Sequence, residues 1–156
     1  MKKLLLVCFY FLFSLVAFSQ IKYTVLNNRI LKADTVIIIQ CRNKQGMLVI
    51  DTSFLARTND SIIFKKGKIL NFHQKKQLAN IIARPDFPKG RFAIKHPYSP
   101  DQIIFLKHKS YRSFIEIGSR KITPSHDFGV TSFTFDVQKG VDFDNFCYEI
   151  GSKRQN

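Results

Sequence analysis

The sequence predicts an α+β domain, built on a mainly antiparallel sheet of about six to eight strands with two helices on one face. Three observations support this class. Short apolar runs typical of strands recur along the chain, only two segments carry convincing helical periodicity, and strands and helices do not alternate as they do in parallel α/β folds. A chain of 156 residues is long enough for one domain with a substantial core.

Residues 1–19 have the features of a signal peptide. Two lysines precede an apolar run from Leu4 to Phe18, and small residues allow cleavage between Ser19 and Gln20. The run is too short for a membrane span, which needs about 20 apolar residues. We therefore expect a periplasmic or secreted protein whose single mature domain covers residues 20–156 and has no transmembrane segment.

The first strand is expected from Thr35 to Cys41, because its Val-Ile-Ile-Ile run is β-branched throughout and fits a strand buried on both faces. The preceding residues 21–33 stay ambiguous between strand and helix. Polar and glycine-containing turns separate the later apolar runs, which suggests hairpins. These further strands are expected at about 47–51, 61–64, 69–70, 92–94, 103–106, 113–117 and 133–137.

The two helices are predicted over about 72–83 and 143–150. Asn71 and Gln74 have the spacing of a capping box, which marks the start of the first helix. Asp142 is a suitable N-cap for the second helix. Its apolar face is expected to hold the residues at helical spacing, Phe143, Phe146, Cys147 and Ile150.

The chain is strongly basic, with a formal net charge of +14 that becomes +12 when the two lysines of the leader are removed. Residues 65–121 hold 14 Lys or Arg against three acids, whereas residues 122–151 hold one Lys against five acids. This asymmetry favours association with an anionic partner, such as a lipid headgroup, an acidic glycan or an acidic protein surface. The alternative is a solvated basic face that the acidic C-terminal part partly balances.

The turn between the strands at 103–106 and 113–117 is the densest candidate for anion contact. Three fixed positive charges, a titratable imidazole and a phenol gather there on a predicted exposed hairpin: Lys107, His108, Lys109, Tyr111 and Arg112. The structural alternative is that these lysines only discourage aggregation at a sheet edge. Nucleic acid is not expected as a partner, because few stacking aromatic residues accompany the basic ones.

Two cysteines remain after cleavage, and export leaves two alternatives for them. A disulfide between Cys41 and Cys147 would close a loop of about 100 residues, worth about 4.7 kcal/mol in the chain-entropy model. Alternatively Cys147 is a free thiol on the apolar face of its helix, where it behaves as a small apolar residue.

The residue types of catalytic and metal sites lack the spacing that such sites need. Ser125-His126-Asp127 cannot form a catalytic triad, because three consecutive side chains diverge. No pair of histidines has a zinc-binding spacing, and the glycines form no phosphate-binding loop. We therefore predict no catalytic residue, no metal and no cofactor.

Residues 70–82, 98–106 and 114–117 resemble a loose group of small exported bacterial proteins of unknown function. In that group the last strand commonly runs into a Cys-x-x-Cys motif, where this chain has Gly118-Ser119-Arg120. The resemblance therefore implies the strand-turn-strand arrangement of 98–117, and any redox or metal role of those cysteines does not transfer to this chain.

Together these features predict a non-enzymatic binding protein of the cell envelope. Its partner would be an envelope component or a protein, bound through the basic hairpin. An anionic membrane surface is one such envelope component. One alternative is a periplasmic hydrolase that acts on an envelope polymer, with His96, His108 or His126 as the general base. Another is a toxin inhibitor or immunity protein.

Overall fold

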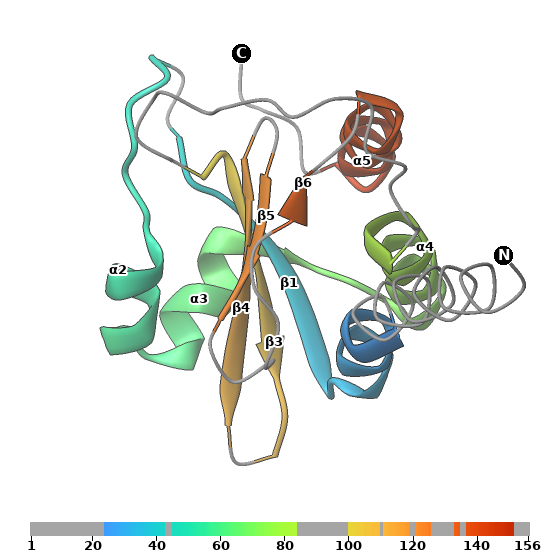
Figure 1. Cartoon of the computed structure of the whole chain (residues 1–156). Coiled ribbons are helices and arrows are strands. Elements are labelled where there is room, and N and C mark those ends of the chain that lie inside the picture. Colours follow the sequence, from blue (N-terminus) through green and yellow to red (C-terminus); the bar gives the residue numbers. More distant parts are fainter. Residues whose placement is uncertain are drawn as a thin grey trace, which may run out of the picture.

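A six-stranded antiparallel sheet with strand order β2-β1-β3-β4-β5-β6 forms the centre of the molecule, as the computed structural model shows (Figure 1). The structure describes residues 24–42, 45–83, 100–109, 111–118, 121–125, 133–134 and 137–151. The α+β class with an antiparallel sheet is confirmed. The strands are β1 (Thr35–Gln40), β2 (Gly67–Ile69), β3 (Gln102–Lys107), β4 (Arg112–Gly118), β5 (Lys121–Pro124) and β6 (Phe133–Thr134).

Helices cover both faces of this sheet (Figure 1). One face carries α4 (Phe72–Ala83), α5 (Val137–Glu149) and a helix over residues 24–32, while α2 (Thr52–Arg57) and α3 (Asp60–Lys66) lie on the other. The two predicted helices do share a face. The prediction of only two helices is wrong, because the described residues contain three more and two of these lie on the opposite face.

Strand β1 shows why the sheet needs covering on both sides. Its Val36 and Ile38 join the core beneath α4 and α5, whereas Ile37 and Ile39 join the core beneath α2 and α3. All four side chains are at most 1% exposed. Burial on both faces, predicted from the β-branched run, is therefore confirmed.

Strands β3 and β4 form the antiparallel hairpin that the sequence predicts, with Lys107 opposite Arg112 next to the turn. Two other expected strands are wrong. Residues 61–64 belong to α3, because the Asn59 side chain accepts a hydrogen bond from Ser61 N at 3.1 Å and caps a helix there. Residues 47–51 form only an isolated bridge between Leu48 and Arg42. The expected strand at 92–94 lies outside the described residues.

Helix α4 has the predicted bounds and the predicted capping box. The backbone N–H of Gln74 donates to the Asn71 side chain at 2.9 Å, and the Asn71 N–H donates to the Gln74 side chain at 3.0 Å. A reciprocal pair of this kind is a purely local signal. That explains why the start of this helix could be predicted.

Helix α5 begins at Val137, well before the predicted start at 143, so Asp142 lies inside the helix and is not its N-cap. Of the expected strand over 133–137, residues 133–134 form β6 and Val137 begins α5, while residues 135 and 136 lie outside the described residues. Lys139 in the first turn of α5 is fully buried, and its Nζ donates to the Ile82 carbonyl in the last turn of α4 at 3.4 Å. This contact between helices favours the longer α5. The predicted apolar face is confirmed, since its four residues are at most 6% exposed.

Candidate functional site

The predicted basic residues lie at the tip of the β3–β4 hairpin. Two backbone hydrogen bonds between His108 and Tyr111 close its turn, with N–O distances of 3.0 and 3.3 Å. Lys109 is exposed, and Tyr111 is 43% exposed. The hairpin therefore presents this part of the chain to solvent, as expected.

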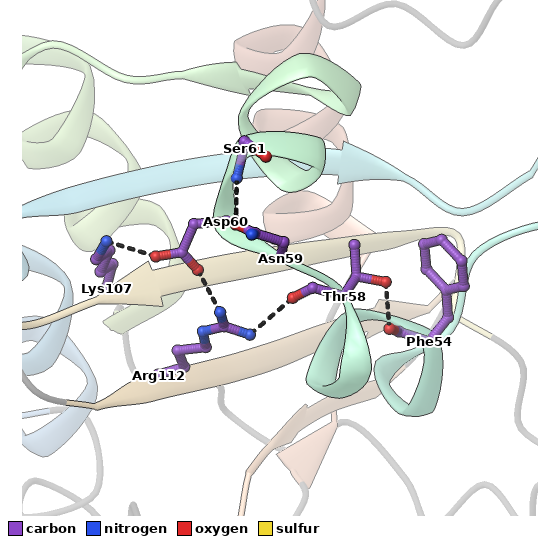
Figure 2. Close-up of polar contacts among 7 residues, drawn as sticks. All are labelled: Phe54, Thr58, Asn59, Asp60, Ser61, Lys107 and Arg112. Carbon is purple, nitrogen blue, oxygen red and sulfur yellow. Dashed lines mark hydrogen bonds and ion pairs between the residues drawn. The ribbon is translucent and has the colours of Figure 1, made fainter.

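Two of the three hairpin cations bind a carboxylate that belongs to the protein itself. Asp60, the first residue of α3, forms ion pairs with Lys107 and with Arg112, the latter at 2.7 Å (Figure 2). Arg112 also donates to the Thr58 carbonyl at 2.9 Å (Figure 2). These contacts fix the linker between α2 and α3 to the hairpin. Lys107 and Arg112 thus have a structural role in addition to their charge.

The imidazole of His108 and the ring of Tyr111 stack on each other, with centroids 4.5 Å apart and planes inclined by 18°. Arg29, from the helix over residues 24–32, donates to the Tyr111 hydroxyl at 2.8 Å and lies 5.4 Å from the centre of its ring. The guanidinium and the two rings hold the hairpin tip in one arrangement. A cation distant in sequence is thereby added to the predicted site.

Further contacts bring more charged residues to the same end of the sheet. Lys75 of α4 donates to the Ala33 carbonyl at 2.8 Å, and Asp34 N donates to the Lys107 carbonyl at 2.9 Å. Lys32 is exposed at the end of the helix over residues 24–32, next to Ala33 in the chain. We call this region the hairpin end; its residues are Arg29, Lys32, Asp34, Asp60, Lys75, Lys107, His108, Lys109, Tyr111 and Arg112.

The hairpin end holds six cations against two carboxylates, a formal balance of +4 with His108 neutral. The sequence placed only three of these cations together. Arg29 and Lys75 were missed because they come from helices that are distant in the chain, and no local pattern indicates that they meet the hairpin. Asp60 was missed for the same reason, since it lies 47 residues from Lys107.

Cys41 and Cys147 are not joined by a disulfide and lie on opposite faces of the sheet. Cys147 packs in the core beneath α4 and α5, and Cys41 packs in the core beneath α2 and α3. The sheet therefore separates the two thiols, and the structure contains no Cys41–Cys147 disulfide. Cys147 is 4% exposed among apolar side chains, which agrees with the alternative interpretation.

Burial, together with the negative charges of Glu116 and Asp101, raises the pKa of the Cys41 thiol from 9.0 to about 12. The folded protein keeps this thiol protonated where the unfolded chain ionises it. Its contribution to stability is therefore complete below pH 9 and declines as the pH rises from 9 toward 12. We expect Cys41→Ala to remove this decline, which amounts to about 1 kcal/mol between pH 8 and pH 10.

Urea unfolding of both proteins at pH 8, 9 and 10 measures this effect. The difference in free energy of unfolding between wild type and Cys41→Ala should shrink as the pH rises. A difference independent of pH would show that the thiol ionises equally in both states. Cys147→Ala is the control, because this variant keeps the Cys41 thiol and should keep the decline that this thiol causes.

The two histidines that the structure describes offer little support for a hydrolase. His108 stacks on Tyr111 at the hairpin tip and His73 is exposed on α4, whereas His96 and His126 lie outside the described residues. An open groove beside α2, lined by residues 48–51, 54, 57 and 58, contains no histidine. Among the described residues no cluster of three His, Cys, Asp or Glu is arranged to hold a metal ion.

Comparison with known proteins finds no matching family model, no similar curated protein and no similar solved structure. Every helix within the described parts of the chain is too short or too polar to span a bilayer. The chemistry of the hairpin end is therefore the basis on which a function can be inferred.

Proposed function

We propose that the protein is an exported, non-enzymatic binding protein that holds an anionic component of the cell envelope at the hairpin end. The single observation that carries this proposal is the collection of six cations and two carboxylates from four separate segments of the chain. A concentration of one sign of charge attracts ligands of the opposite sign and speeds their association.

Internal pairing does not cancel this charge. Asp60 carries one negative charge between two cations, so the three groups together keep a charge of +1. Lys75 bonds to a neutral carbonyl, so it also keeps its charge. The pairs around Asp60 hold the region rigid, and a preorganised group of cations binds anions at a lower entropic cost than free side chains do.

The proposal is tested with Lys32→Glu/Lys109→Glu, because both side chains are exposed and neither contacts Asp60 in the structure. Reversing Lys107 or Arg112 would also break an ion pair and confuse binding with stability. We expect the double variant to bind phosphatidylglycerol vesicles or immobilised heparin at least tenfold more weakly at low salt, at about 1 kcal/mol per basic residue near an anionic surface.

A matched control separates this site from the net charge of the whole protein. Lys65→Glu/Lys66→Glu reverses two exposed cations in the last turn of α3 and gives the same net charge. The control should bind within about threefold of wild type. Equal losses in the two double variants would assign the binding to overall charge and refute a site at the hairpin end. Comparing the affinity for vesicles with the affinity for heparin distinguishes a lipid headgroup from an acidic glycan as the ligand.

A further inference from the structure

Three consecutive large apolar residues stand exposed beside α2. Met47, Leu48 and Val49 are 57%, 44% and 54% exposed, and Phe54 of α2 is 40% exposed next to them. A run of exposed apolar residues costs solubility and is unusual unless it serves an interaction. This apolar surface is therefore a candidate for an interaction site.

Leu48, Val49 and Phe54 border an open groove with a volume of about 470 Å³. Its lining is completed by Ile50, which is buried, and by polar residues of α2 and its flanks, namely Asp51, Arg57 and Thr58. The size suits one or two large side chains of a ligand. Leu48, Val49 and Phe54 provide its apolar surface.

The segment that carries the apolar run is fixed to the sheet. The backbone N–H groups of Val49 and Ile50 both donate to the Cys41 carbonyl, at 2.8 and 3.2 Å. Arg42 donates to the Gly46 carbonyl at 2.7 Å and to Asp101 at 2.8 Å. The groove is thus formed before any ligand arrives, which lowers the entropic cost of binding.

The groove is lined by two charged residues, Asp51 and Arg57, which have different roles. The Asp51 carboxylate caps α2 by accepting from Phe54 N at 2.7 Å. Arg57 donates through its Nε to the Ser53 carbonyl at 3.1 Å, and its exposed side chain lines the groove. A guanidinium in this position is complementary to a carboxylate.

We propose that this groove binds an extended peptide segment of a protein partner, with a large apolar side chain against Leu48, Val49 and Phe54 and a carboxylate against Arg57. The site is separate from the hairpin end and independent of the function proposed there. The two regions meet at the α2–α3 linker, where Arg112 donates to the carbonyl of Thr58. A partner could accordingly be held by one site while an anion occupies the other.

The test is a selection from random heptapeptides displayed on phage, with the mature protein immobilised. Enriched peptides should carry Asp or Glu next to a large apolar residue. We expect their affinity to fall at least tenfold on Arg57→Glu and at least fivefold on Leu48→Ser. The matched controls are Lys66→Glu for the charge and Val141→Ser for the exposed apolar residue, since Val141 is 48% exposed on α5.

Three outcomes would overturn the proposal. These are no enrichment, enriched peptides without an acidic residue, and binding that Arg57→Glu and Leu48→Ser leave unchanged while both variants unfold at the wild-type temperature. Size-exclusion chromatography adds a further outcome. A wild-type dimer that Leu48→Ser converts to a monomer would assign the groove to a second copy of this chain. If Arg57→Glu and Leu48→Ser still bind vesicles as wild type does, their loss of peptide binding is independent of the function proposed for the hairpin end.

Discussion

Replacing Gly67 with alanine is expected to lower the free energy of unfolding by about 2 to 3 kcal/mol, the upper part of the range for overpacked sites. Gly67 begins β2 and lies opposite Ile39 of β1. A Cβ atom there would stand 2.3 Å from Ile37 Cγ2 and 2.9 Å from both the Ile38 carbonyl and Ile39 Cγ1. These are buried atoms of a strand packed on both faces, so the chain cannot yield without moving β2 away from β1.

Urea unfolding followed by circular dichroism measures this loss, and Lys68→Ala is the control in the same strand. Lys68 is exposed, so its replacement should change the free energy of unfolding by less than about 0.5 kcal/mol. If Gly67→Ala were as stable as Lys68→Ala, the close approach of β2 to β1 would be incorrect.

Replacing Asp60 with asparagine is expected to lower the free energy of unfolding by about 2 kcal/mol. Hydrogen bonds to charged groups contribute about 1.5 to 3 kcal/mol each. The two ion pairs of Asp60 should contribute less than the sum of two such bonds to the free energy of unfolding. The Lys107 and Arg112 side chains are 36% and 34% exposed, so water screens both pairs. Asparagine keeps the shape of the side chain, but it removes the charge and replaces one acceptor oxygen with an NH2 donor.

The control for this prediction is Asp144→Asn, because Asp144 is exposed on α5. A double-mutant cycle of Asp60→Asn with Arg112→Met should give a coupling energy of about 1 kcal/mol, since the two residues are in contact. Additive losses would contradict the ion pair. The variant also separates the effect on stability from the effect on anion binding. Asp60→Asn raises the net charge of the hairpin end, so the affinity for an anion should not fall while the free energy of unfolding does.

The parts of the fold that could be predicted depend on local signals. The capping box of Asn71 and Gln74 marks the start of α4, and the β-branched run of β1 indicates a strand buried on both faces. The cap of α3 was an equally local signal that was overlooked. Asn59 precedes Asp60 and Ser61, but the glycine turn after Lys66 suggested a hairpin instead.

Other features depend on contacts between distant residues. The first turn of α5 is held by Lys139 against the end of α4, and a lysine in a sequence gives no indication that it will be buried. The same limit applies to the candidate site. Hydrophobic and charge patterns located the hairpin, but only the fold shows that Asp60 binds two of its cations and that Arg29 and Lys75 join it.

The central claim is that the hairpin end is the place where an anionic partner binds. An NMR titration of the ¹⁵N-labelled mature protein with a sulfated heparin hexasaccharide tests it most directly, because each backbone amide reports separately. The proposed function predicts the largest shift changes at Arg29, Lys32, Lys109 and Tyr111, with little change at Lys65 and Lys66. Changes centred on the α3 lysines, spread evenly over all exposed lysines, or absent at low salt would contradict it.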